Sequence, residues 1–183
     1  MTSLAVQQQG LLDLIKGRTT NVSDPYLRDV ASCRELAMLR EIAVWWRKVH
    51  VESQCRFTSR LLKRMRNFDS VVSAYFNENA TSPFVEELAL DFLRTLRDDP
   101  DPLVRAVSQF ECALQSVRLG SADVFEVTWD RHPDLVIRAL EQASEMPAAE
   151  VGCIYRMKVA NDIPGLIACT RMLTRSATAS ACE

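Results

Sequence analysis

The sequence predicts an α+β fold that is mainly helical, with a small antiparallel three-stranded sheet near the C-terminus. As far as Gly120, apolar residues recur at spacings of three and four, which is typical of amphipathic helices. Beyond Gly120, two segments alternate apolar and polar residues, which is typical of half-buried strands. The chain has only five glycines and seven prolines in 183 residues, and this composition favours long elements over a turn-rich all-β fold.

Residues 1–120 are predicted to form a helical lobe. The first helix should begin near Leu4 and end near Gly17, because glycine suits the position after a helix. A long helix is expected over Val30–Val51 and a basic one over Cys55–Arg66, followed by a short helix around Tyr75. Three dipeptides pair a capping side chain with a first-turn proline and should start further helices: Asp24-Pro25, Ser82-Pro83 and Asp101-Pro102.

Residues 121–175 are predicted to form a smaller lobe in the order β-α-β-β. The segment 124–129 (VFEVTW) alternates, and a helix over 133–143 should follow it. The segment 153–160 (CIYRMKVA) alternates again, and a turn at 161–165 leads to a returning strand over 166–173. The small polar residues 176–183 are expected to be a flexible tail.

The composition of the chain indicates the cellular compartment in which the protein is expected. The N-terminus is polar and rich in glutamine, unlike a signal peptide, and no window approaches the roughly 20 apolar residues of a membrane span. We therefore expect a cytoplasmic protein that makes no membrane contact. Its six cysteines should then be reduced, and their wide spacing, with no C-x-x-C, predicts no metal or other cofactor in this chain.

Charge is distributed unevenly along the chain. Residues 1–70 carry 12 basic and 7 acidic side chains, whereas residues 71–183 carry 10 and 17. Within 47–66, seven cations are opposed only by Glu52: Arg47, Lys48, Arg56, Arg60, Lys63, Arg64 and Arg66. Such a basic helix can bind phosphates or an acidic protein, and it can equally be a solvated face.

The sequence predicts no catalytic residues. The two histidines, His50 and His132, lie far apart, and the known nucleophile, zinc-protease, P-loop and dinucleotide motifs are absent. Pairs such as Glu86-Glu87 and Asp98-Asp99 fall at helix starts or breaks, where acidic residues suit the helix dipole or the turn. We therefore expect a chain that is not an enzyme.

The terminal sheet offers a binding mode of its own. Three strands leave two edges with unpaired N–H and C=O groups, and an extended peptide can add to such an edge as a further strand. The alternative is that the helical lobe or the tail covers both edges.

Four successive phrases carry a family resemblance: FVEELALDFLRTL, DPLVRAVSQFECALQSVR, VFEVTWDRHPDLVIRAL and IYRMKVANDIPGLI. Over roughly residues 70–173 the chain resembles the partner proteins of multinuclear non-haem iron-dependent oxidases. These proteins act in the biosynthesis of ribosomally made peptides, such as methanobactin and 3-thiaglutamate products. The resemblance rests on the order of elements rather than on a short diagnostic motif.

The resemblance implies that two subunits have separate roles. The iron and the oxidative chemistry would belong to a barrel-shaped partner subunit, with which this chain would form a heterodimer. The chain itself would bind the leader of a precursor peptide, as a precursor-peptide recognition element does, and present a cysteine of that peptide to the iron. The docking edge would be the strand 153–160 or the strand 124–129.

Candidate site residues follow from this interpretation of the sheet. The peptide should contact one strand and two cations that can meet leader carboxylates: Val124, Phe125, Glu126, Val127, Thr128, Trp129, Arg156 and Lys158. The interface with the oxidase should include an aromatic side chain and two cations of the basic helix: Trp45, Arg60 and Arg64.

Two other functions stay open at this stage. Helices followed by a β-hairpin can make a winged helix, so the chain can be a nucleic-acid-binding regulator that uses the basic helix 47–66. Against it, the hairpin lies in the half of the chain with a net charge of −7, and this negative charge disfavours the binding of nucleic acid. A stand-alone enzyme is the third possibility, and the absence of catalytic motifs argues against it.

Overall fold

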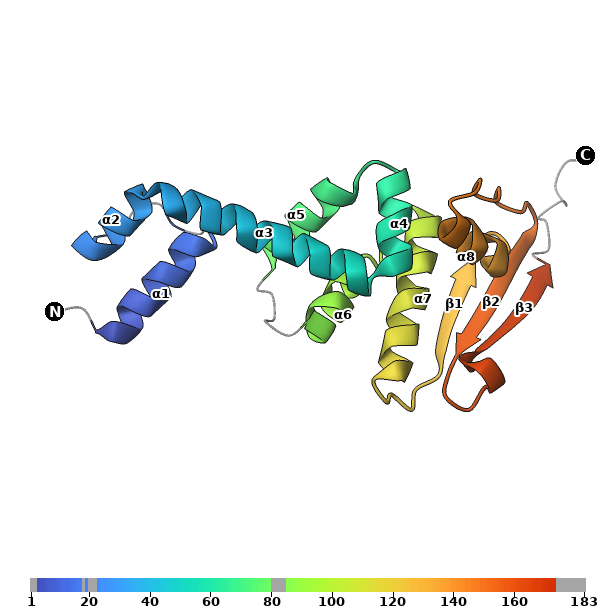
Figure 1. Cartoon of the computed structure of the whole chain (residues 1–183). Helices are drawn as coiled ribbons and strands as arrows, with labels where there is room; N and C mark the ends of the chain where they lie inside the picture. The colour runs from blue at the N-terminus through green and yellow to red at the C-terminus, as the bar shows by residue number, and fades with distance from the viewer. Residues whose placement is uncertain (1–2, 18, 20–22, 80–84, 174–183) are drawn as a thin grey trace, which may run out of the picture. The chain divides into compact units, whose positions relative to one another are not determined.

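The computed structural model describes residues 3–17, 19, 23–79 and 85–173. It confirms a mainly helical α+β fold with a small antiparallel sheet (Figure 1). The chain divides into two compact units, Met1–Val49 and His50–Glu183. Among the described residues, no helix combines the length and the apolar character needed to cross a membrane.

The first unit is built from α1 (Leu4–Ile15), α2 (Pro25–Ser32) and the first part of α3 (Arg34–Gln54). Its small core consists of Leu14, Leu27 and Leu36, one from each helix. The Asp24 side chain accepts hydrogen bonds from the backbone N–H groups of Tyr26 and Leu27, so the predicted cap is confirmed. The single helix predicted over Val30–Val51 is wrong at its start, because the backbone is extended at Cys33 and separates α2 from α3.

The helices of the second unit gather around α7. They are the end of α3, α4 (Arg56–Arg64), α5 (Phe68–Glu78), α6 (Val85–Thr95) and α7 (Pro102–Arg118). Asp101 caps α7 as predicted and accepts hydrogen bonds from Leu103 N at 2.8 Å and Val104 N at 3.4 Å. Most α7 side chains are buried, because α4, α6 and the sheet all pack against it. The predicted start at Ser82-Pro83 lies outside the described residues.

The sheet consists of β1 (Phe125–Trp129), β2 (Cys153–Val159) and β3 (Ile167–Leu173), with α8 (Pro133–Gln142) between β1 and β2. A short 3₁₀ turn, η1 (Pro164–Leu166), precedes β3. The strands are antiparallel in the order β1-β2-β3, and Met157 pairs with both Val127 and Cys169. The predicted β-α-β-β order is confirmed.

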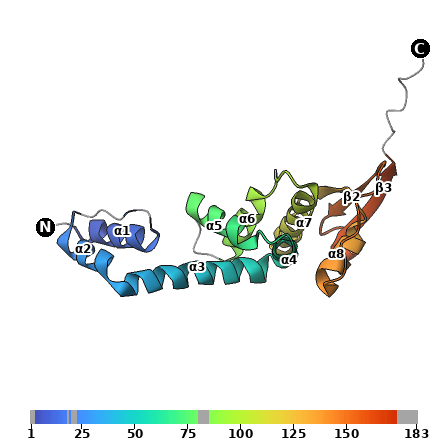
Figure 2. The ribbon, with the colours of Figure 1, turned by 90° about the horizontal axis from the view of Figure 1, so that it is seen from above.

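One hydrophobic core joins the sheet to the helices of the second unit. Phe110 of α7 and Trp129 of β1 are both buried, and their ring centroids lie 5.9 Å apart. Figure 2 shows α7 between the sheet and helices α5 and α6. The boundary between the two compact units lies between Val49 and His50, whereas the sequence suggested a boundary after residue 120. The predicted tail 176–183 lies outside the described residues.

Candidate functional site

β2 is the central strand of the sheet. It pairs with β1 over Phe125–Trp129 and with β3 over Ile167–Leu173, so both of its backbone edges are in use. The prediction that strand 153–160 is a docking edge is therefore wrong. The edges of this sheet belong to β1 and β3, and the alternative docking strand 124–129 lies at one of them.

A groove of about 400 Å³ follows the outer edge of β1. We call it the β1 groove. Four consecutive residues line it on the strand side, Val124 to Val127, so the cavity runs along the backbone edge rather than over one face of the sheet. Its opposite wall consists of residues from the end of α6, from the turn after it and from α7: Leu93, Arg94, Arg97, Gln109, Cys112, Ala113 and Ser116. Its volume lies within the range of about 300–1,000 Å³ that is usual for ligand sites.

The strand side of the β1 groove mainly offers backbone. Val127 and Trp129 are almost fully buried in the core, so their side chains are not available to a ligand. Val124 is 55% exposed, and Glu126 and Thr128 point to the opposite, solvated face of the sheet. Of the predicted contacts in 124–129, the structure therefore favours main-chain contacts over side-chain contacts.

The two predicted sheet cations already have a partner. Lys158 Nζ lies 3.2 Å from Glu126 Oε1, and Arg156 Nε lies 3.7 Å from Glu126 Oε2. All three side chains are about half exposed, so each pair contributes little to stability. A leader carboxylate that approaches Arg156 or Lys158 would compete with Glu126.

Arg60 and Arg64, predicted at a partner interface, contact the end of α8 within this chain. Arg60 Nη1 donates to Leu140 O at 3.1 Å, and Arg64 donates to Ser144 O at 2.7 Å and Ala139 O at 2.9 Å. Cations suit a helix C-terminus, where carbonyl groups lack partners within the helix. These contacts account for both guanidinium groups inside the fold, and they reduce the cationic surface that a nucleic acid would meet.

Trp45 lies on an exposed apolar stripe of α3. Its ring centroid is 5.3 Å from that of Trp46 in an edge-to-face arrangement. The α3 stripe is defined by five side chains that are 48–58% exposed: Met38, Leu39, Ile42, Trp45 and Trp46. Their spacing places them along one side of the helix.

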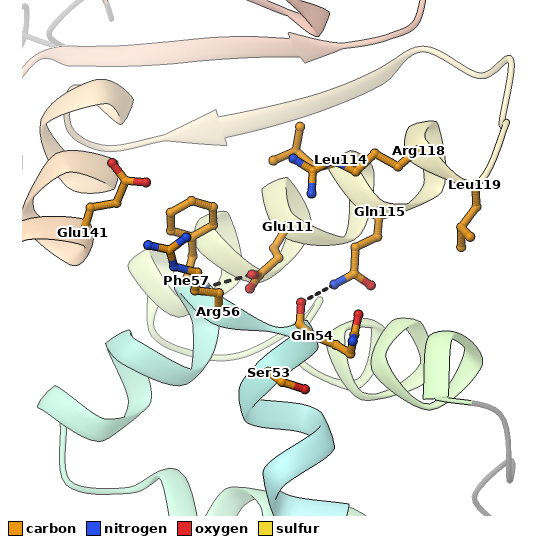
Figure 3. A pocket seen from close by; sticks show the side chains of 10 residues that line it. All are labelled: Ser53, Gln54, Arg56, Phe57, Glu111, Leu114, Gln115, Arg118, Leu119 and Glu141. Atoms are coloured by element: carbon orange, nitrogen blue, oxygen red, sulfur yellow. Dashed lines mark hydrogen bonds between the residues drawn. The ribbon is translucent and has the colours of Figure 1, made fainter.

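A second cavity, the α4 pocket, has about 410 Å³ and is lined by residues of α3, α4, α7 and α8 (Figure 3). Glu111 lies in its floor and is only 4% exposed. Its carboxylate accepts hydrogen bonds from Phe57 N at 2.9 Å and Thr58 N at 2.8 Å. Burial raises the pKa of Glu111, although these bonds oppose the shift. Glu111 therefore caps α4, whose own N-cap residue, Cys55, makes no side-chain cap bond.

A polar cluster connects β3 to the start of β2 and to Glu150, which precedes it. Tyr155 donates its hydroxyl to Glu150 Oε1 at 2.7 Å, and Arg171 donates to Glu150 Oε2 at 3.2 Å and to Cys153 Sγ at 3.0 Å. The bond to Glu150 raises the pKa of Tyr155 to about 12, since it favours the protonated phenol. The cluster holds the β2–β3 hairpin in register.

Of the cysteines near α7, Cys55 is buried and Cys112 is partly buried. Burial raises the pKa of both Cys55 and Cys112, which disfavours the reactive thiolate. Over the part of the chain that the structure describes, no group of three or more His, Cys, Asp or Glu side chains is placed to hold a metal ion.

Sequence reasoning missed the residues that build the far wall of the β1 groove. Arg94 lies in the last turn of α6 and Arg97 in the turn that follows it, where a cation is ordinary, so their type and position do not mark them as site residues. Only the packing of α6 and α7 beside β1 brings them to the strand edge. Comparison with family models, with curated proteins and with solved structures finds no match to this chain.

Proposed function

We propose that this chain is a non-catalytic accessory subunit that binds the leader of a ribosomally made precursor peptide. The leader would add as an extended strand to the outer edge of β1. The chain would form a heterodimer with an iron-dependent oxidase and present a cysteine of the peptide to it. The observation that carries the proposal is the β1 groove, which exposes the backbone edge of a strand over consecutive residues.

Strand addition fits the chemistry of this edge. Every second residue of an edge strand directs its N–H and C=O groups away from the sheet, and each main-chain hydrogen bond contributes about 0.5–1.5 kcal/mol net. Beyond Gln109, the α7 wall of the groove is formed by Cys112, Ala113 and Ser116, which have small side chains. Small side chains leave room for a peptide backbone between α7 and β1.

The α3 stripe supports the heterodimer. Exposed apolar side chains gathered on one surface are typical of protein interfaces, and tryptophan is enriched at the energetic centre of such interfaces. A standard interface buries about 800 Å² on each partner, so the α3 stripe would form the centre of a larger contact. The oxidase subunit is the occupant that the proposal assigns to it.

The test is co-expression with an iron-dependent oxidase of the proposed class, followed by size-exclusion chromatography with light scattering, with and without its precursor peptide. A 1:1 complex that takes up the peptide through its leader is the expected result. A chain that stays alone and ignores the peptide contradicts the proposal. A salt-sensitive mobility shift of DNA would then support the regulator instead.

Two tryptophan substitutions distinguish the two cavities. Ser116→Trp fills the β1 groove and should abolish peptide uptake, whereas Ser53→Trp fills the α4 pocket and should leave it unchanged. Trp45→Ala should weaken the heterodimer without affecting peptide binding by the separate chain. Equal loss of peptide binding in both serine variants would contradict the assignment to β1.

A further inference from the structure

The cations of the β1 groove differ in how far they are already neutralised. Arg94 pairs with Asp91 on the same helix, at 2.9 Å, with both side chains largely exposed. Arg97 uses its backbone carbonyl to accept a hydrogen bond from Gln109 Nε2 at 3.1 Å. Its guanidinium group makes no hydrogen bond or ion pair with any of the described residues, although it lines the groove.

The groove carries little negative charge to balance these cations. Glu126 is the one acidic side chain among the described lining residues, and it is engaged by Arg156 and Lys158 on the solvated face. Asp98 and Asp99 follow Arg97 in the chain, but neither lines the groove. An extended peptide between β1 and α7 would therefore meet a positively charged wall at the end of α6.

We propose that the peptide bound along β1 carries an aspartate or glutamate side chain that faces α6 and is recognised by Arg97. This inference rests on the proposed function and names the peptide class that the site selects. A guanidinium group presents a fork of N–H donors that matches both oxygens of a carboxylate. Arg94 adds a second positive charge, and the Gln109 amide lies on the same wall.

Strand geometry determines which peptide positions qualify. Side chains of an extended strand alternate between two faces, so only every second residue of the peptide points toward α6 and α7. The acidic residue should therefore occupy one position of that set, and neighbouring positions of the same set should be small or apolar against Cys112 and Ala113. This arrangement differs from the sequence-based expectation that Arg156 and Lys158 read the leader carboxylates, because those cations lie on the other face.

The experiment selects dodecapeptides from a displayed random library on the full chain. The strongest binder is then synthesised with a fluorescent label for anisotropy measurements. Binding of the selected peptide should be lost in Ser116→Trp, which shows that it occupies the β1 groove. The selected peptides should carry an acidic residue at a constant position, and Asp→Asn at that position should weaken binding about tenfold.

A double-mutant cycle assigns the carboxylate to Arg97. Arg97→Gln should weaken binding of the acidic peptide about tenfold and should bind the acidic and the amide peptides equally well. Arg138→Gln removes the same charge from an exposed site on α8 outside the groove and should preserve the discrimination.

The outcomes separate the two proposals. Peptides that require the groove but show no acidic residue, or that bind Arg97→Gln with undiminished preference for the acid, overturn the inference and leave the proposed function standing. A library that yields no peptide sensitive to Ser116→Trp overturns both.

Discussion

Glu111 joins two segments that lie 54 residues apart in the chain through one buried carboxylate. It replaces the missing side-chain cap of α4 by accepting from Phe57 N and Thr58 N. Glu111→Ala would leave two N–H groups without partners, one of them buried, at a cost of about 1–3 kcal/mol for each buried group. We expect the free energy of unfolding in urea to fall by about 1–3 kcal/mol. Glu141→Ala, on the exposed rim of the same pocket, should change it by less than about 0.5 kcal/mol.

The same carboxylate should make stability depend on pH. Burial raises the pKa of Glu111 above its usual value of 4.5, so the folded protein binds this proton more tightly than the unfolded chain does. The contribution of Glu111 to the free energy of unfolding should therefore increase as the pH is lowered from neutral toward 4.5, and this gain is complete below that value.

Glu111→Gln does not titrate in this range and provides the reference, because the other carboxylates are common to both proteins. Urea unfolding should be measured for both proteins at pH 7 and pH 5. The free energy of unfolding of the wild type, relative to that of Glu111→Gln, should be higher at pH 5 than at pH 7. A difference that shrinks on acidification would contradict the direction of the shift.

Residue-level prediction succeeded where the signal is local. Asp24 and Asp101 cap the residues immediately after them, so a capping side chain beside a proline was sufficient to predict them. The role of Glu111 was not predictable, since its partners come from a helix far away in the sequence. The contacts of Arg60 and Arg64 were likewise not predictable, because their guanidinium groups bind carbonyl groups at the end of α8, about 80 residues later.

Among the elements, α8 ends in a conformation that its sequence does not favour. Ala143 has φ = 55°, in the left-handed region, where a side chain costs roughly 1–2 kcal/mol. Glycine adopts this conformation freely and is the usual residue at such an end. Ala143→Gly should therefore raise the free energy of unfolding by about 1 kcal/mol.

The measurement is urea or thermal unfolding of the full chain. Ala149→Gly, in the exposed loop after α8, serves as the control and should be neutral or slightly destabilising, because glycine increases the freedom of the unfolded chain. A loss of stability in Ala143→Gly larger than in the control would contradict a left-handed backbone at residue 143.

The sequence was sufficient to predict the individual strands, but not their spatial order in the sheet. Alternation in 124–129 and 153–160 predicted β1, β2 and the buried face of each, and the structure confirms both. Alternation says nothing about which strand lies in the middle, since each strand carries the same period. The pairing of β1 with β2 depends on how α8 returns the chain, and this pairing decides that β1 has an open edge and β2 has none.

At the level of the molecule, the sheet depends on α7. Val127, Trp129 and Met157 are buried in the core that includes Phe110, so a fragment containing residues 121–183 would expose them to water. We expect that fragment to be unfolded, because a small sheet needs a packed face for stability. A fragment containing residues 50–183 keeps the whole core and should unfold cooperatively.

Circular dichroism with thermal melting distinguishes the two fragments. A cooperative transition in 121–183 alone would support the boundary after residue 120 that the sequence suggested. The sequence showed a change of periodicity at that point, but a change from helices to strands does not mark a change of core. Only long-range packing shows where one compact unit ends.

The central position of β2 also has a consequence for synthesis of the protein on the ribosome. Thirty residues separate the end of β1 from the end of β2, which at ordinary translation rates takes roughly 2–6 s. During that interval β1 has emerged with two unpaired edges and can associate with a strand of a neighbouring nascent chain. The charge of Glu126 and the shortness of β1 both oppose such association. Peptide binding in the β1 groove, as proposed, would become possible only after β2 has been synthesised and has paired with the other edge of β1.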